Sequence, residues 1–192
     1  MYRKFGKRVF DLFFSTILLI VFIPLWIVIP ILIKINSPGG IVFKQRRVGI
    51  DSTYFTIYKF RTMKEGTPDI PTDELTKEEQ EKFNTTVGKF LRRFSLDEIP
   101  QLINIFRGDM SFVGPRPALY NQPLLIKLRK EKGIDKIRPG VTGLAQISGR
   151  DSLTIPEKVE YDYQYLKTLS FANDIKIILG TIKAVLTGKG AN

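Results

Sequence analysis

The sequence contains neither cysteine nor histidine. Without cysteine there can be no disulfide framework, thiolate nucleophile or cysteine-ligated zinc site. Without histidine, histidine-dependent catalytic triads and imidazole-bound metal sites are excluded as well. Any chemistry must therefore use carboxylates, arginine, lysine, tyrosine, hydroxyl groups or a hard cation held by oxygen ligands.

Acidic residues are scarce relative to basic ones. The 192 residues include 30 Lys and Arg but only 19 Asp and Glu, which gives a formal net charge of +11. This balance favours anionic partners such as nucleic acid, phosphorylated metabolites or an acidic membrane surface. The length allows one compact domain with its own core and an appendage.

An uncharged apolar run, "LFFSTILLIVFIPLWIVIPILI", covers residues 12 to 33. About 22 residues of helix reach across a hydrocarbon core of about 30 Å, so the run predicts a membrane segment. A signal peptide is the alternative, but its apolar region is shorter and ends in small residues before a cleavage site. Pro24 at the midpoint and Pro30 near the end each predict a kink or break, because proline lacks the amide donor and crowds the preceding turn.

Basic residues flank this run on both sides. The two flanks carry Arg3, Lys4, Lys7 and Arg8 before it, and Lys34, Lys44, Arg46 and Arg47 after it. The positive-inside tendency favours keeping both flanks in the cytoplasm, which a single span cannot do. The sequence therefore favours a re-entrant helix–break–helix over a plain span. Asp11, at the entry of the run, is either an interfacial cap or a partner for nearby basic residues.

The rest of the chain predicts a small domain of helices around a β-hairpin. Residues 40 to 63 form two runs rich in β-branched and aromatic residues around a turn at 49–52, which predicts a hairpin with half-buried strands rather than a base-stacking sheet. Residues 64 to 84 are polar and predict a surface insert. The segments "VGKFLRR", "PQLINIF" and "SFVG" then predict two helices and a short strand, followed by a stiff "PRP" loop at 115–117.

The C-terminal third alternates glycine-rich and helical segments. Residues 138 to 152, "RPGVTGLAQISGRDS", are either a loop whose backbone approaches a ligand closely or a set of tight turns. Thr154 and Glu157 predict a capping box for the helix that contains "YDYQYL". In the last helix an apolar stripe for packing against the core or a membrane interface is expected. Its members are Phe171, Ile175, Ile178, Ile182 and Val185.

Two adjacent carboxylates, Asp97 and Glu98, lie in "RRFSLDEIPQLINIFRGDMSFVGPRP", residues 92 to 117. Ser95 and Glu98 match a capping box, but that register would place Pro100 inside the helix, where it has no amide to donate to the preceding turn. Asp97 is therefore the predicted N-cap. A helix N-terminus stabilises a carboxylate and attracts phosphate, so a structural and a chemical role are predicted at the same place.

Arginines surround this acidic pair in the sequence. They exceed what two carboxylates need for neutralisation, and guanidinium forks suit a diphosphate. They are Arg92, Arg93, Arg107 and Arg116. From spacing alone, a phosphate-handling acidic site and a purely structural helix start remain equal alternatives.

Five motifs together resemble the bacterial sugar transferases, the monotopic polyprenyl-phosphate phosphoglycosyl transferases. They are "KRVFDLFFS", "YKFRTM", "LRRFSLDEIPQLINIFRGDMSFVGPRP", "RPGVTGLAQISGR" and "YDYQYL". The resemblance runs from about residue 2 to 187, with the 64–88 insert unlike the family core. Many family members have a Ser-Pro pair at the membrane break, whereas this chain has Ile23-Pro24, so the proline is kept and the serine hydroxyl is lost.

The resemblance implies an α/β fold of α+β character in two parts. Residues 1–36 would form a membrane-embedded re-entrant helix broken at Pro24. Residues 37–192 would form a small cytosolic catalytic domain, with helices around a short β-hairpin and amphipathic helices at the membrane interface. The chain would then be located at the inner (cytoplasmic) membrane, with its catalytic domain on the cytoplasmic face.

The resemblance also implies a reaction. A sugar phosphate would pass from a UDP-sugar to undecaprenyl phosphate, releasing UMP, as the first membrane step of polysaccharide, capsule, exopolysaccharide or glycoconjugate synthesis. Asp97 would be the nucleophile that forms a covalent phosphosugar intermediate, and Glu98 its partner in binding Mg²⁺ or handling protons. The segments "RPALYNQ" and "SGRD" resemble members that use N-acetylated amino or deoxyamino sugars.

Supporting residues carry over from the same motifs. Lys59, Arg92, Arg116 and Arg150 would bind phosphate or nucleotide, and Asp162 would be a supporting acid. The partners would be the UDP-sugar, undecaprenyl phosphate and membrane lipids, with no role for nucleic acid. A second copy of the chain and glycosyltransferases of the same pathway are candidate protein partners.

Two other functions compete with this one. The first is a membrane-tethered binding or scaffold protein whose basic face takes anionic lipid or nucleic acid, which would not require the acidic pair or the "GPRP" loop. The second is a glycosyltransferase that adds a sugar without its phosphate. Released nucleotide separates the latter from phosphosugar transfer, since it would be UDP rather than UMP.

Overall fold

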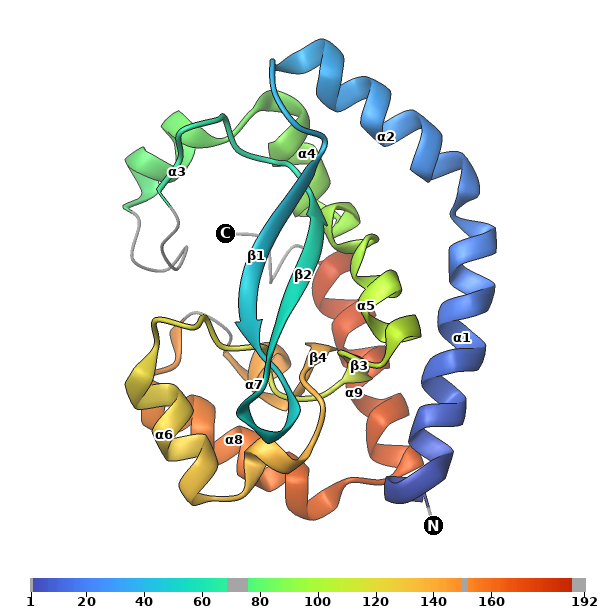
Figure 1. The fold of residues 1–192 in the computed structure, drawn as a ribbon, viewed down its shortest axis with the longest axis vertical. Helices are drawn as coiled ribbons and strands as arrows, with labels where there is room; N and C mark the ends of the chain where they lie inside the picture. The colour runs from blue at the N-terminus through green and yellow to red at the C-terminus, as the bar shows by residue number, and fades with distance from the viewer. Residues whose placement is uncertain (1, 69–75, 150–151, 188–192) are drawn as a thin grey trace.

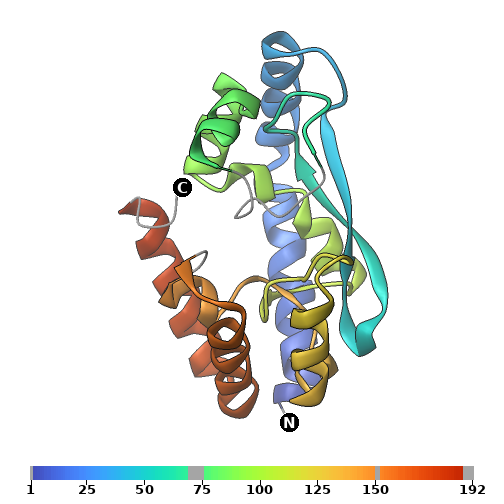
Figure 2. The same ribbon diagram turned by 90° about the vertical axis from the view of Figure 1, so that its left-hand side faces the viewer.

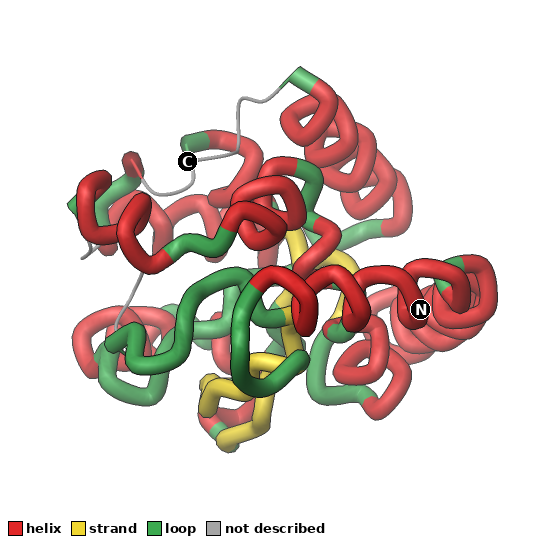
Figure 3. The backbone as a smooth tube through the Cα atoms, turned by 90° about the horizontal axis from the view of Figure 1, so that it is seen from above, coloured by secondary structure: helices red, strands yellow, loops and turns green. Residues whose placement is uncertain are grey.

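A computed structural model describes residues 2–68, 76–149 and 152–187 of the chain. Helices make up most of the described backbone, and the strands form two small two-stranded sheets (Figures 1 and 3). The elements are a π-helical turn η1 (Tyr2–Gly6), α1 (Lys7–Val21), α2 (Ile23–Asn36), β1 (Val42–Val48), η2 (Ile50–Ser52), β2 (Tyr54–Phe60), α3 (Lys77–Phe83), α4 (Thr86–Arg93), η4 (Leu96–Glu98), α5 (Gln101–Arg107), β3 (Ser111–Val113), α6 (Pro123–Glu131), η5 (Ile134–Lys136), β4 (Gly140–Thr142), α7 (Leu144–Ser148), α8 (Ile155–Thr168) and α9 (Phe171–Leu186). This helix-rich arrangement with small sheets agrees with the predicted α/β class.

The apolar N-terminal run forms two helices, α1 and α2, bent by 61° with respect to each other at Phe22. The break falls where Pro24 was predicted to cause it: Pro24 lies in the first turn of α2 and has no amide for the carbonyl of Ile20. Of the kink or break predicted at Pro30, the break does not occur, because α2 continues through Pro30 to Asn36. Among the described residues neither helix alone is long and apolar enough to cross a membrane, and the bent pair meets the test of length and composition only jointly.

Polar contacts fix α1 to the rest of the molecule. Asp11 is 1 % exposed and accepts hydrogen bonds from the Ser111 hydroxyl (3.0 Å) and the Phe112 amide (3.1 Å) of β3. Lys7 pairs with buried Asp174 of α9 at 2.6 Å. Asp11 therefore has its hydrogen-bond partners inside the domain, on β3.

Strands β1 and β2 form the predicted antiparallel hairpin, in which Gln45 pairs with Ile57. Asp51 and Ser52 in the turn have positive φ angles of 53° and 58°. Ile57 and Phe60 are buried in the main core with Ile29 and Ile33 of α2. The hairpin thus has the predicted half-buried strands. Figure 2 shows the hairpin and the α8–α9 pair at opposite sides of the molecule.

The second sheet joins β3 and β4 in parallel, with Ser111 opposite Gly140 and Val113 opposite Thr142. Its glycines pack backbone against backbone: a Cβ atom on Gly140 would lie 2.1 Å from the amide nitrogen of Gly114, and one on Gly143 would lie 2.2 Å from the carbonyl oxygen of Gly114. These two glycines therefore serve close packing within the protein, whereas Gly149, the third glycine of the described 138–149 segment, borders a cleft.

The two C-terminal helices, α8 and α9, can be compared with their sequence patterns. The capping box of α8 is present, since the Thr154 side chain accepts from the Glu157 amide and the Glu157 side chain accepts from the Thr154 amide. On α9, Ile178 packs against the core, whereas Phe171 and Ile182 are 52 % and 50 % exposed, because the buried face of the helix contains Asp174 and Ile177. For these two exposed residues, packing at a membrane interface stays a prediction.

Candidate active site

The acidic pair lies in the 3-10 turn η4, ahead of α5. The prediction that Asp97 is the N-cap was wrong: Pro100 occupies the cap position of α5 and no side chain caps it. Proline has no amide to satisfy, and the chain enters the helix through turn hydrogen bonds such as Glu98 amide to Ser95 carbonyl (3.2 Å). The alternative capping box is absent as well, because Ser95 makes no side-chain cap bond.

Ser95 sets the direction of this turn. Its φ of 55° and ψ of 23° place it in the left-handed region, which non-glycine residues seldom occupy. The conformation ends α4 and turns the chain into η4, so that Asp97 is directed into the protein and Glu98 toward a cleft. The left-handed conformation of Ser95, two residues before Asp97, could not be predicted from the sequence.

Asp97 is buried, with 8 % of its surface exposed. Burial raises the pKa of its carboxyl, and the neighbouring Glu98 carboxylate raises it further. Lys59 and Arg92 oppose this shift by stabilising the charged form. A carboxylate with weakened solvation and a raised pKa is more basic than one in water, which favours nucleophilic attack.

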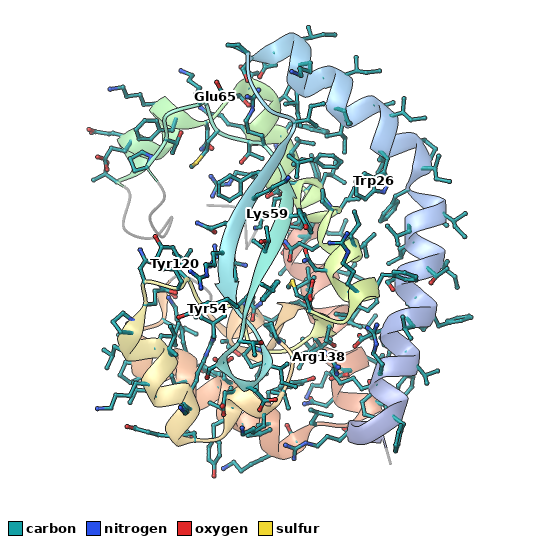
Figure 4. The ribbon with its side chains drawn as sticks, viewed as in Figure 1. Trp26, Tyr54, Lys59, Glu65, Tyr120 and Arg138 are labelled. Atoms are coloured by element: carbon teal, nitrogen blue, oxygen red, sulfur yellow. The ribbon has the colours of Figure 1, made fainter. Side chains whose placement is uncertain are left out.

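Glu98 lies between two of the predicted cations. Its carboxylate oxygen Oε1 is 2.7 Å from the Lys59 Nζ atom and 3.9 Å from an Arg116 nitrogen. Lys59 projects from β2 near the middle of the molecule (Figure 4). Arg116 comes from the loop that follows β3. Elements far apart in sequence therefore meet at the acidic pair.

Arg92 reaches the site from α4, where its NH1 atom donates to the Asn84 side-chain oxygen at 3.1 Å. Helix α4 packs closely on the end of the hairpin, since a Cβ atom on Gly88 would lie 1.9 Å from the Thr62 carbonyl oxygen. This packing brings Arg92 near enough to Asp97 to lower its pKa.

The remaining predicted residues lie elsewhere. Arg107 donates to the Tyr58 hydroxyl at 3.2 Å, and Arg93 lies over the ring of Phe94. Asp162 is 1 % exposed and is bound by Arg129. Arg150 is outside the described residues. Of the four arginines near the acidic pair in sequence, the structure brings Arg92 and Arg116 to it.

A cleft of about 660 Å³ opens beside the site. Its lining includes the polar residues Ser95, Glu98 and Arg116. It also includes apolar side chains, among them Phe22, the residue at which α1 and α2 bend. Lys183 of α9 and Gln146 of α7 also border the cleft, and neither was predicted from the sequence. Gln146 lies within the "RPGVTGLAQISGR" motif, but Lys183 lies outside the five motifs, and the fold alone brings α9 to this place.

The described residues contain no group of three or more acidic side chains that could hold a metal ion. Asp97 and Glu98 supply two adjacent carboxylates. Because Mg²⁺ is commonly held by one or two carboxylates together with substrate phosphates and water, this donor set fits that ion.

Comparison with known proteins identifies the protein family. A model of the family described as "Bacterial sugar transferase" matches residues 2–188. The chain belongs to the bacterial sugar transferase family. The resemblance of its motifs is thereby confirmed, and the chain is a transferase.

Several relatives of this sugar transferase are similar over nearly its whole length. The exopolysaccharide production protein ExoY of Rhizobium meliloti is 36 % identical, over 97 % of this chain and 88 % of the relative. The sugar transferase EpsL of Bacillus subtilis is 38 % identical, over 96 % and 89 %. A UDP-glucose:undecaprenyl-phosphate glucose-1-phosphate transferase of Escherichia coli is 38 % identical over 96 % of this chain, which spans only 41 % of that longer protein.

Proposed function

We propose that this sugar transferase moves a sugar 1-phosphate from a UDP-sugar to undecaprenyl phosphate, releases UMP, and forms a covalent intermediate on Asp97. The observation that carries the proposal is the acidic pair itself, in which a buried carboxylate of raised pKa adjoins one held between Lys59 and Arg116. The names of two relatives, from E. coli and Komagataeibacter xylinus, support the transfer of a sugar phosphate and the choice of undecaprenyl phosphate as acceptor.

In the first step a carboxylate oxygen of Asp97 attacks the phosphorus that carries the sugar. The bond between this phosphorus and the bridging oxygen breaks, and UMP leaves with that oxygen. In the second step a phosphate oxygen of undecaprenyl phosphate attacks the same phosphorus, and the bond to Asp97 breaks. The products are undecaprenyl diphosphate sugar and the free Asp97 carboxylate, so no proton needs to be added or removed.

Like charges oppose the first step, since a carboxylate approaches a diphosphate. Lys59, Arg92 and Arg116 place three cations around the pair, where they lower this repulsion and stabilise charge on the departing phosphate. Asp97 and Glu98 would hold the Mg²⁺, which supplies further neutralisation of phosphate charge when bound. Arg150 as a phosphate ligand and Asp162 as a supporting acid stay predictions.

The bent helix pair supports a re-entrant membrane anchor with the domain on the cytoplasmic side of the inner membrane. Exposed Phe, Leu and Ile side chains on α4, α5 and α9, among them Phe90, Phe106 and Leu186, supply apolar surface for helices at the interface. The cleft extends from Glu98 to Phe22. A lipid phosphate at the bilayer surface would thus reach the acidic pair while its chain stays near the helix bend.

The topology can be tested by labelling, because the chain has no native cysteine. Single cysteines at positions 3 and 44, one before and one after the bent pair, should both react with a membrane-impermeant thiol reagent from the cytoplasmic face only. Reaction of the two from opposite faces would establish a plain span and reject the re-entrant anchor.

The identity of the transferred sugar is the most detailed claim of the proposal. The sequence favours an N-acetylated amino or deoxyamino sugar, whereas the names of relatives point to glucose. Exchange of labelled UMP into each of a panel of UDP-sugars, without lipid acceptor, tests both the sugar and the chemistry. We expect rapid exchange with the true donor. Transfer with release of UDP instead of UMP would establish a sugar transfer without phosphate, and binding without turnover would favour the scaffold function. Homodimers and pathway enzymes stay predicted partners.

A further inference from the structure

We propose that Arg129 of α6, anchored by Asp162 of α8, is a positioning residue that fixes the main chain of Arg116 in its orientation toward the donor diphosphate. The proposal rests on the proposed function, in which Arg116 binds that diphosphate. It gives Asp162 a role at a distance from the reacting atoms.

The loop of Arg116 is held through its carbonyl groups. Four consecutive carbonyl oxygens, from residues 115 to 118, accept hydrogen bonds from three different parts of the chain. The donors, in order, are the Gly140 amide (2.9 Å), the Arg129 NH1 atom (2.7 Å), the Arg47 NH1 atom (3.0 Å) and the Val48 amide (2.9 Å). Pro115 and Pro117 fix two φ angles in the same loop. The backbone under Arg116 is therefore held on both sides of its Cα atom.

Arg129 is itself held rigidly. Its NE and NH2 atoms donate to one carboxylate oxygen of Asp162, at 3.0 and 2.7 Å, and this leaves NH1 directed at the Arg116 carbonyl. The Arg129 side chain is 12 % exposed and the Asp162 side chain 1 %. A planar guanidinium can make all three bonds at once, whereas a lysine ammonium cannot match that fixed fork.

The side chain of Arg116 needs this support. It is 40 % exposed, and its nearest approach to Glu98 is 3.9 Å, which is too long for a hydrogen bond. A long, half-exposed side chain has many rotamers, so its guanidinium stays near the cleft only if its Cα atom is fixed. The hydrogen bond from Arg129 supplies one of these restraints.

A purely structural role for the pair makes a different prediction, and the chain offers a matched control. Lys132, the C-cap residue of α6, also forms an ion pair with Glu160 of α8, at 2.5 Å, but on the exposed surface. Within the described part of the chain, the carbonyls of residues 115–118 accept from Gly140, Arg129, Arg47 and Val48, and not from this surface pair. If Arg129 only ties the two helices together, Lys132→Gln should resemble Arg129→Lys in its effect on ligand binding.

The test measures the affinity of the full chain for UDP in the presence of Mg²⁺, by titration calorimetry in nanodiscs, alongside UMP exchange and thermal unfolding. We expect Arg129→Lys to weaken UDP binding roughly tenfold, the effect of losing one charge-assisted hydrogen bond. Asp162→Asn, which keeps the side-chain shape, should weaken it in the same direction, and Lys132→Gln should leave it unchanged.

A second background separates positioning from folding. In an Arg116→Gln protein, Arg129→Lys should have no further effect on UDP affinity, because the residue it positions has been removed. Two results would overturn the inference. One is that Arg129→Lys weakens UDP binding as much in the Arg116→Gln protein as in wild type, and the other is that Arg129→Lys and wild type bind UDP equally well. If wild type binds UDP but exchanges no UMP, the covalent mechanism fails while the UDP affinities still decide this inference. If wild type binds no UDP, the inference falls because Arg116 has no diphosphate to bind.

Discussion

The turn that carries the acidic pair and the loop that carries Arg116 differ in how they hold a functional side chain. The turn at 95–98 contains a left-handed Ser95 and a carboxyl whose pKa is raised by burial. In the loop at 115–118, every carbonyl has a hydrogen-bond donor, and two prolines stiffen the chain. The carboxylate is thus made reactive by an unfavourable environment, whereas the cation is fixed by a fully satisfied one. Substitution of Asp97 should accordingly change mainly the rate of transfer, and substitution of Arg116 mainly the KM for the donor.

The largest expected effect is on the turn. Asp97→Asn removes the proposed nucleophile but keeps its shape, so transfer of sugar phosphate to undecaprenyl phosphate should fall by roughly 10³-fold or more. Because a buried carboxyl of raised pKa is replaced by a neutral group, thermal stability should be kept or improved. If Asp97→Asn loses stability together with activity, burial of the Asp97 carboxylate does not destabilise the protein as argued.

In the loop, Arg116→Gln should lower transfer by roughly a hundredfold, mainly through a higher KM for the donor, because the charged fork on the diphosphate is lost. Steady-state kinetics at varied UDP-sugar check this. Lys127→Gln, at an exposed position of α6, is the control and should be neutral. An unchanged KM for Arg116→Gln would remove Arg116 from donor binding.

A substitution at the base of the loop is expected to lower the stability of the protein. Gly140 donates to the Pro115 carbonyl, and a Cβ atom on it would overlap the Gly114 amide at 2.1 Å. Gly140→Ala should therefore lower the free energy of unfolding by about 2 kcal/mol, measured by denaturant titration. Gly40→Ala is the matched control, since no atom lies within 4 Å of its added Cβ. Equal stability of the two variants would show that the close packing is not required.

The smallest expected effect concerns Ser95. Glycine adopts the left-handed region without a steric cost but has more freedom in the unfolded chain. Ser95→Gly should therefore change the free energy of unfolding by less than about 1 kcal/mol, while Ser95→Ala, which keeps the strained φ, should be the less stable of the two. The reverse order would mean that the Ser95 conformation is not strained.

The sequence was sufficient for local elements and insufficient for contacts between distant ones. The hairpin, the break near Pro24 and the capping box of α8 follow from short-range patterns, and the structure has all three. The start of α5 was misjudged, because a left-handed Ser95 allows a 3-10 entry that needs no cap.

The site shows the same division. Asp97, Glu98, Lys59, Arg92 and Arg116 were named from motifs, and the structure gathers them. Arg129 and Lys183 were missed, because their places are fixed by the packing of helices that are separate in sequence. Asp162 was named, but only the structure connects it, through Arg129, with the loop of Arg116.

The covalent step is tested most directly by the intact mass of the protein after incubation with the UDP-sugar that supports exchange and Mg²⁺, quenched without lipid acceptor. The proposed mechanism predicts that wild type gains the mass of one sugar phosphate, that Asp97→Asn gains none, and that adding undecaprenyl phosphate before the quench removes the adduct. A wild-type protein that releases UMP in the presence of acceptor but never carries this mass, or an adduct that persists in Asp97→Asn, would contradict the assignment of Asp97 as the nucleophile.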